Sequence, residues 1–242
     1  MIETQDVTSF KRAIDAISSF ISEGNFRFSE KGISLRAVDP SQIVLVDCFI
    51  EKNAFSAYEL EPTFVGVDVV EFSRMLARSL PNDKLLLDVG ENEIHLNLEG
   101  EFSRTFHLPL IDVSENEKEL KLPAQQFDAK VEVNARLLKE ALKDALIFGS
   151  SVTVKVRDGK FALEAKGSPG VLKTVSKQSH LITVHTNVNV TSKYSLNFLS
   201  NVIKEADNDS TVLLEFKSDA PMRITYPIGK AKLQYYLAHM IL

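Results

Sequence analysis

The feature that most restricts the fold of this sequence is an order of elements that occurs twice with a nearly constant offset. In each half, an extended segment, an amphipathic helix and several short strands follow one another, and the order then begins again. A hairpin turn at Gly32 has a counterpart 127 positions later at Gly159, and the Asn82-Asp83 turn has a counterpart 126 positions later at Asn208-Asp209. Because two landmarks share nearly one offset, the sequence predicts two similar domains of about 100 to 130 residues each.

Four segments carry apolar residues at helical spacing, and each begins at a suitable capping residue. The first helix is expected to start at Thr8 and to end near Gly24, where a glycine would take the left-handed cap. The second is expected after Asp68, the third after Asn134, and the fourth from Ser195.

The segments between the helices alternate apolar and polar residues and are bounded by turn residues, as strands are. The expected strands cover residues 2–7, 25–29, 33–38, 43–50, 55–60, 64–67, 84–89, 93–98, 103–110, 128–133, 152–156, 160–165, 172–176, 181–184, 211–216, 222–227 and 232–238. So many strands with so few helices predict an α+β fold, in which the helices lie on one face of the sheets.

Residues 112–126 are predicted to connect two domains, 1–111 and 127–242. Positions 114–119 hold four charges and no apolar side chain, so this stretch cannot contribute to a core. Leu120, Leu122 and Pro123 then follow, and Pro123 favours an extended backbone before it. Two interpretations remain open here: a solvated spacer, or a linker whose leucines are covered by a partner.

Composition excludes several classes of protein. A single cysteine, Cys48, cannot form an intrachain disulfide or a multi-cysteine metal cluster, and its apolar neighbours predict a buried thiol. No apolar run approaches the ~20 residues that span a bilayer, and the first residues do not resemble a signal peptide. We therefore expect an intracellular protein with no membrane partner.

The net charge of −5 argues against nucleic-acid binding only if the cations are evenly spread. They are not, because each predicted helix carries at least one cation on the side opposite its apolar stripe. Neighbouring acids such as Asp15 and Glu140 leave an ordinary salt-bridged surface as the alternative for any single helix.

Motifs for catalysis or for a cofactor are not found in the sequence. It contains no glycine-rich phosphate loop, no nucleophile elbow and no paired histidine–glutamate motif. The five histidines are scattered, and none lies at metal-ligand spacing from another. We therefore predict no enzymatic activity, no catalytic residue, no cofactor and no metal, with a nucleic-acid-processing enzyme as the remote alternative.

Three segments resemble the PCNA-type sliding clamps of eukaryotes and archaea, most closely an archaeal clamp subunit. Residues 32–46 read GISLRAVDPSQIVLV, residues 233–238 read LQYYLA, and Asp219-Ala220-Pro221 matches the loop before the penultimate strand of that family. Helix order, duplication and central linker agree over essentially the whole chain. His239 stands where the family usually has proline, and Gln42 stands where the family commonly has another residue. The acidic tail that is usual in the family does not follow.

The resemblance implies a duplicated two-domain clamp subunit, three of which close into a ring with helices inside and sheets outside. Double-stranded DNA would thread this ring without being read in sequence, and an ATP-driven clamp loader would be needed to place it there. The residues implied to face DNA are Lys11, Arg12, Arg74, Arg78, Arg136, Lys139, Lys143 and Lys204. The subunit edges implied are residues 103–110 and 171–179.

The resemblance also implies a pocket for a short peptide that carries glutamine and paired aromatics, as found in the DNA polymerase and other replication and repair partners of the family. Its matching wall is Val38, Gln42, Ile43, Leu45, Leu120, Leu122, Pro123, Pro221, Ala238 and Ile241. The implied role is a processivity factor associated with DNA, in the nucleoid if archaeal or the nucleus if eukaryotic. A subunit of a heterotrimeric or checkpoint-type clamp is the alternative within the fold.

Overall fold

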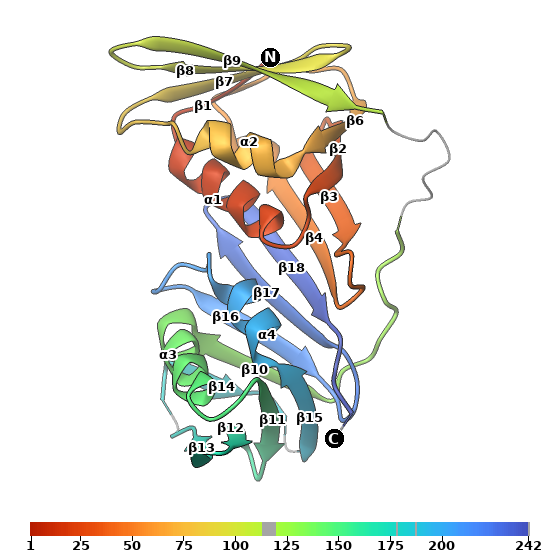
Figure 1. The fold of residues 1–242 in the computed structure, drawn as a ribbon, viewed down its shortest axis with the longest axis vertical. Coiled ribbons are helices and arrows are strands. Elements are labelled where there is room, and N and C mark those ends of the chain that lie inside the picture. The colour runs from red at the N-terminus through yellow and green to blue at the C-terminus, as the bar shows by residue number, and fades with distance from the viewer. Residues whose placement is uncertain (113–119, 178, 187, 242) are drawn as a thin grey trace. The chain divides into compact units, whose positions relative to one another are not determined.

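A computed structural model describes residues 1–112, 120–177, 179–186 and 188–241 (Figure 1). The chain divides into two compact units. The N-terminal unit comprises Met1–Gln42, Val46–Lys121 and Ile228–Leu233, and the C-terminal unit comprises Ile43–Leu45, Leu122–Pro227 and Gln234–Leu242. Each unit thus consists mostly of one half of the chain. Residues 113–119 of the predicted linker lie outside the described residues.

The first half of the chain forms two α-helices and nine strands. The helices are α1 (Val7–Ser18) and α2 (Val69–Leu76), with the 3-10 helix η1 (Lys52–Ala54) between them in sequence. The strands are β1 (Ile2–Thr4), β2 (Glu23–Ser29), β3 (Gly32–Val38), β4 (Val44–Glu51), β5 (Ala57–Tyr58), β6 (Thr63–Asp68), β7 (Lys84–Val89), β8 (Glu93–Glu99) and β9 (Ser103–Ile111). They follow the order β4-β3-β2-β6-β9-β8-β7-β1-β5, and α1 and α2 lie side by side (Figure 1).

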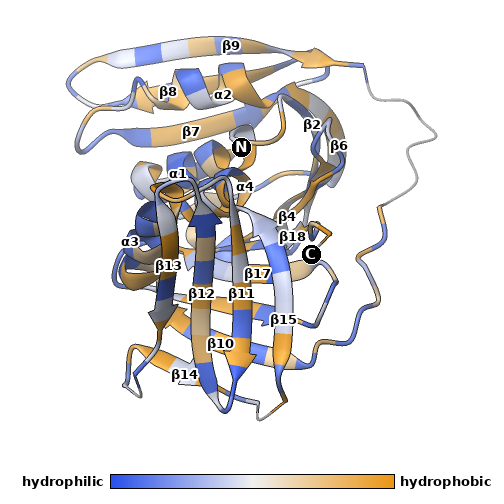
Figure 2. Cartoon of the chain, turned by 60° about the horizontal axis from the view of Figure 1, so that its bottom comes forward, coloured by the Kyte–Doolittle hydropathy of each residue, from blue (hydrophilic) through white to orange (hydrophobic). Residues whose placement is uncertain are grey.

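The second half also has two α-helices and nine strands. The helices are α3 (Ala135–Leu146) and α4 (Leu196–Ile203). The strands are β10 (Ala129–Asn134), β11 (Ser151–Arg157), β12 (Lys160–Gly167), β13 (Gly170–Val175), β14 (Ile182–Val184), β15 (Val190–Ser195), β16 (Thr211–Phe216), β17 (Met222–Ile228) and β18 (Ala231–Leu237). One group follows the order β14-β10-β16-β17-β18 and the other β13-β12-β11-β15. Figure 2 shows the alternation of apolar and polar residues along the second group, and the predicted α+β class is confirmed.

Phenylalanine side chains form the centre of the N-terminal unit. Phe72 of α2 meets Phe10 of α1 edge to face, with ring centroids 6.0 Å apart, and meets Phe26 of β2 at 6.2 Å. Phe55 adds a third edge-to-face contact to Phe10 at 5.9 Å. These edge-to-face pairs bury large apolar areas without placing any polar atom in the core.

Tyrosine side chains are buried in the interior of the C-terminal unit, and their hydroxyls are hydrogen-bonded. Tyr226 of β17 donates to the carbonyl oxygen of Val202 in α4 at 2.6 Å, and its ring stacks on Tyr235 at 5.9 Å. Tyr194 of β15 donates to the carbonyl oxygen of Ala220 at 2.8 Å. Burial of a hydroxyl is tolerated here because each has an acceptor.

Helix starts were predicted well, with one error. The side chains of Asp68 and Asn134 accept hydrogen bonds from the third residue beyond them, as predicted for N-caps. The cap of α1 is Asp6, which accepts from the backbone N–H of Ser9 at 3.0 Å, and the prediction of Thr8 is wrong.

The predicted end of the first helix at Gly24 is also wrong, because α1 ends at Ser18. Gly24 instead lies in β2, where an added Cβ would come within 2.7 Å of the Leu35 side chain. This glycine is required by close packing between neighbouring strands and not by a left-handed cap.

Strand β15 was missed by the sequence analysis. Its inward-facing positions are Val190, Ser192 and Tyr194, and a serine there interrupts the apolar alternation. Ser192 is nevertheless fully buried beside the carbonyl of Ala220. None of the helices within the described residues has both the length and the apolar character needed to cross a lipid bilayer.

Candidate nucleic-acid and partner surfaces

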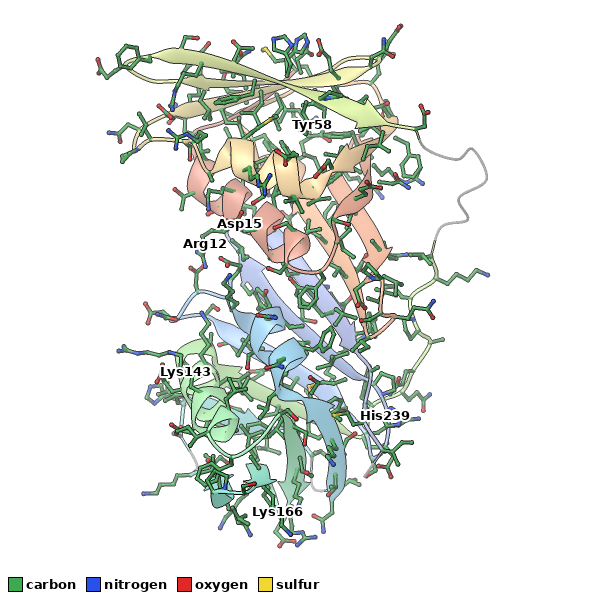
Figure 3. All side chains as sticks on the ribbon, viewed as in Figure 1. Arg12, Asp15, Tyr58, Lys143, Lys166 and His239 are labelled. Atoms are coloured by element: carbon green, nitrogen blue, oxygen red, sulfur yellow. The ribbon has the colours of Figure 1, made fainter. Side chains whose placement is uncertain are left out.

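The polar side of α1 and α2 carries four of the predicted cations. Lys11 is paired with Asp15 on the next turn, and Asp15 also accepts from Ser73 of α2 at 2.6 Å. Arg74 pairs with Glu71, and both side chains remain largely in solvent, so the pair contributes little to stability. Arg12 is half-buried on α1, and Arg78 is exposed just beyond α2 (Figure 3).

The other four predicted cations lie on or beside α3 and α4. Arg136, Lys143 and Lys204 are exposed, and Lys143 is labelled on α3 in Figure 3. Lys143 donates to Glu140 at 2.7 Å, and this bond lowers the pKa of Glu140 below its ordinary value, so that carboxylate stays ionised.

Lys139 differs from the other predicted cations. Its ammonium donates to the carbonyl oxygen of Ala206 at 2.6 Å and to Oδ1 of Asn208 at 3.2 Å, just after α4. It therefore joins α3 to the end of α4, and its donors are already used within the C-terminal unit. Of the remaining cations, Arg74, Arg136 and Lys143 are exposed on α2 and α3. Arg78 and Lys204 are exposed just beyond α2 and α4.

In the N-terminal unit, Arg36 holds the described end of the linker. Its guanidinium donates to Asp47 at 2.9 Å and to the carbonyl oxygen of Leu120 at 2.7 Å. The Leu120 side chain is left 42% exposed, and Val38 on β3 is 37% exposed. Both line a hollow of about 470 Å³, so two of the predicted pocket residues come together here.

Gln42, a third predicted pocket residue of this unit, stands on a tight turn. The Asp39 carboxylate accepts from the backbone N–H of Ser41 at 3.0 Å, and the Asp39 carbonyl accepts from the N–H of Gln42 at 2.8 Å. Gln42 has a φ of 58° and an exposed side chain. The turn therefore fixes its backbone and leaves its amide accessible to solvent.

Seven predicted pocket residues belong to the C-terminal unit. The backbone N–H of Ala238 donates to the carbonyl oxygen of Ile43 at 2.9 Å, which places the end of β18 beside the start of β4. The side chains of Ile43, Leu45 and Ala238 are half-buried, and that of Ile241 is 91% exposed. These apolar side chains are partly or fully accessible to solvent, so a bound partner could bury them.

The linker also has contacts in this unit. The side chain of Gln125 donates to the carbonyl oxygen of Pro221 at 3.2 Å. Leu122 and Pro221 are half-buried, whereas Pro123 is exposed. His239, labelled in Figure 3, is half-buried after β18, and the next residue, Met240, donates its backbone N–H to Lys193 of β15 at 2.7 Å.

The strands that the resemblance implies as subunit edges are β9 and β13. In the described residues, β9 pairs with β6 only at Leu110 and Ile111, so most of its outer edge has no neighbour. β13 is the last strand of its sheet, with Val171 64% exposed. Long unpaired edges of this kind favour strand addition between chains.

The helical spacing of Leu137, Leu138, Ala141, Leu142 and Leu146 predicts that these residues form the apolar stripe of α3, and this prediction is partly wrong. Its buried residues are Ala135, Leu138, Leu142 and Ala145, while Leu137 and Leu146 are exposed. Leu137 lines an apolar cavity of about 200 Å³ beside Val175 of β13. Leu137 thus adds to the apolar surface beside β13, and neither exposed leucine is part of the core.

No two histidines stand at metal-ligand spacing in the sequence, but the fold brings two of them together. His95 of β8 is directly opposite His107 of β9, and both rings contact Glu93. Their separation of twelve positions conceals this contact in the sequence. If the predicted strands 93–98 and 103–110 pair as a hairpin around Gly100, however, they predict that His95 and His107 lie opposite one another.

Cys48, in contrast, is as predicted. It is fully buried in β4, and burial raises the pKa of its thiol to about 12. A thiol held in its neutral form is a poor nucleophile and a poor metal ligand, so this residue has a packing role.

Comparisons with known proteins identify the family of this chain. The family model described as proliferating cell nuclear antigen, N-terminal domain, matches residues 1–117, and the C-terminal domain model of the same family matches residues 121–241. A relative from Thermococcus kodakarensis, named DNA polymerase sliding clamp 1, is 34% identical over 234 residues, which cover 95% of this chain and 93% of the relative.

Solved structures of the same family have the same fold. A crystal structure of PCNA from Thermococcus kodakaraensis is 26% identical, covers 99% of each chain and has a TM-score of 0.91. A structure of the C-terminal region of FEN-1 bound to A. fulgidus PCNA has a TM-score of 0.90 and 26% identity, over 100% of this chain and 99% of that one. The chain therefore belongs to the proliferating cell nuclear antigen family of DNA polymerase sliding clamps, with the two-domain fold of that family.

Proposed function

We propose that this chain acts as a DNA sliding clamp: a subunit of a ring that encloses double-stranded DNA and tethers a DNA polymerase and other replication and repair proteins. The observation that carries the proposal is the match of the two family models to residues 1–117 and 121–241, together with cations on the polar sides of α1, α2 and α3 and at Lys204 just after α4. The domain boundaries proposed are 1–111 and 127–242, with the connector between them. The role is non-catalytic and places the protein on DNA within the cell.

The proposed DNA contacts are electrostatic and independent of base sequence. They comprise Lys11, Arg12, Arg74, Arg78, Arg136, Lys143 and Lys204, and Lys139 acts mainly by joining α3 to α4. Cations that meet phosphates without reading base edges suit a protein that must move along the duplex. Ion pairs such as Lys143–Glu140 are exposed and weak, so a phosphate can replace the carboxylate.

The DNA contacts are tested by replacing Arg78, Arg136, Lys143 and Lys204 together with Ala. The salt dependence of DNA association should fall by up to about one unit of slope for each lost phosphate contact. A control variant changes three exposed strand residues, Lys160→Ala, Lys166→Ala and Lys232→Ala, and should keep the parent slope. Equal slopes for the parent and the helix variant would refute the DNA-facing role of these helices.

The proposed partner contacts are apolar side chains within each unit: Leu120 in the N-terminal unit, and Leu122 and Ile241 in the C-terminal unit. Their exposed or half-buried apolar side chains favour a short peptide with aromatic residues, since its burial would remove apolar area from water at about 25 cal/mol per Å². FEN-1 bound to a clamp through its C-terminal region in a solved relative supports this choice of partner.

Replacing Leu120 and Leu122 with Ser tests the partner site. We expect the melting temperature to be nearly unchanged, because Leu120 is exposed and Leu122 only half-buried, and the affinity for an aromatic-containing partner peptide to fall about tenfold or more. The control Lys121→Ser, at the exposed position between them, should retain peptide affinity. A large fall in melting temperature would instead assign the leucines to the core.

Ring assembly is proposed to join β9 of one chain to β13 of the next, giving a trimer. Val171→Asp should abolish the trimer because it places a charge in an apolar edge, whereas Leu80→Asp, at an exposed position after α2, should not. The mass of the chain alone in solution measures both. A monomer or dimer for the parent chain would favour the alternative, a subunit of a heterotrimeric clamp that needs sister chains.

A further inference from the structure

The hairpin of β8 and β9 carries three potential metal ligands on one face of the sheet. Glu93 and His95 are two residues apart on β8, so their side chains point the same way. His107 is directly opposite His95 on β9. Ile94, between Glu93 and His95 on β8, and Leu108, next to His107 on β9, point to the opposite face of the sheet and are buried in the core.

The polar atoms of these three side chains converge. Nε2 of His95 lies 2.7 Å from Oε1 of Glu93, and Nδ1 of His107 lies 3.2 Å from the same oxygen. The imidazole rings are 4.6 Å apart between centroids. One ligand atom from each residue falls within 4.8 Å of the other two.

We propose that Glu93, His95 and His107 form a surface site for a divalent transition metal ion, best suited to Zn²⁺. Two imidazoles and one carboxylate are a ligand set that zinc accepts, at distances of about 2.0 to 2.2 Å, with a fourth position left for water. Ligand atoms around such an ion are about 3.3 Å apart, so small rotations of three partly exposed side chains complete the site.

The local electrostatics favour a cation at this place. The Glu93 carboxylate lies between two imidazole nitrogens, so the group combines one anionic ligand with two imidazole ligands. Asp88 of β7 is in register with His95 on the neighbouring strand, and its carboxylate lies 3.9 Å from the N-terminal ammonium, which it offsets. Imidazole nitrogens select borderline ions such as Zn²⁺ over the hard ion Mg²⁺.

The site is complete within one hairpin of the N-terminal unit and does not depend on the clamp function. Strand addition at β9 would use backbone groups along the strand edge, whereas the His107 side chain stands perpendicular to the sheet. Zinc binding and ring assembly can therefore be measured separately on the same preparation.

The test is calorimetric titration of ZnCl₂ into the tag-free full-length chain at neutral pH. We expect one ion per chain, a rise in melting temperature with zinc, and no binding of MgCl₂ under the same conditions. His95→Ala and His107→Ala should each weaken zinc binding at least tenfold, and so should Glu93→Gln, which preserves side-chain shape.

A second histidine–glutamate pair supplies the matched control. His185 lies 3.2 Å from Glu132, with an exposure similar to that of His95. Among the described residues, His185 belongs to no group of three potential metal ligands. His185→Ala should leave both the affinity and the stoichiometry unchanged. The proposal is overturned if the parent chain does not bind zinc, if His95→Ala and His107→Ala bind it as the parent does, or if His185→Ala weakens binding as much as they do.

Discussion

Gly32 and Gly159 occupy equivalent hairpin turns in the two halves of the chain, yet their surroundings differ. Gly32 has a φ of 140°, and an added Cβ would lie 2.1 Å from the carbonyl oxygen of Ile50. Gly159 has a φ of 71°, and an added Cβ would meet nothing within 4 Å. The duplicated turns therefore share the need for positive φ, while only the first has a neighbouring strand pressed against it.

The second pair of equivalent residues differs in the same direction. Asp83 is buried, accepts from the backbone N–H of Leu80 at 2.6 Å and forms an ion pair with Arg104. Asp209, 126 positions later, is exposed. Equivalent positions in a duplicated fold thus differ in energetic weight, which is set by what each unit packs around them.

The largest expected effect comes from the glycine comparison. Gly32→Ala should lower the free energy of unfolding by at least about 3 kcal/mol, because backbone strain adds to a clash with backbone atoms that cannot rotate away. Gly159→Ala should cost only about 1 to 2 kcal/mol, the strain of a left-handed residue. Denaturant midpoints of the two variants measure the difference, and equal midpoints would show that β4 can move away from the Gly32 turn.

The aspartate comparison should give a slightly smaller effect. Asp83→Ala removes the acceptor of the Leu80 N–H and the partner of a guanidinium that is itself only partly exposed, so we expect a loss of about 2 to 3 kcal/mol. Asp209→Ala should stay within about 0.5 kcal/mol of the parent. Thermal melts of both variants decide this comparison, and a large loss for Asp209→Ala would mean that its turn carries more of the stability than its exposure suggests.

The sequence predicted most strands and three of the four helix starts, because alternation and capping are local signals. Local signals failed where a long-range contact chose the residue: Gly24 fits against Leu35, and Ser192 is buried beside the carbonyl of Ala220. Lys139 shows the same limit at the proposed DNA surface. Helical spacing places it among the surface cations, but only the structure shows that its ammonium is bound to Ala206 and Asn208.

The phenylalanine core of the N-terminal unit and the tyrosine core of the C-terminal unit give the last comparison, with the smallest expected effect. One variant removes a buried hydroxyl group and the other adds one. Tyr226→Phe leaves the Val202 carbonyl without the buried donor that lies 2.6 Å from it, which should cost about 1 to 2 kcal/mol. Phe72→Tyr places a hydroxyl among the rings of Phe10 and Phe26, where it should cost about 1 to 3 kcal/mol if it finds no acceptor. Both changes alter one oxygen atom, so the apolar area of the ring is nearly constant. The urea midpoints of both variants should therefore be lower than that of the parent. Tyr226→Phe loses a buried donor in the C-terminal unit, and Phe72→Tyr buries an unpaired hydroxyl in the N-terminal unit. A Phe72→Tyr variant as stable as the parent would mean that the phenylalanine cluster has an acceptor within reach, and that the two cores differ less than their side chains indicate.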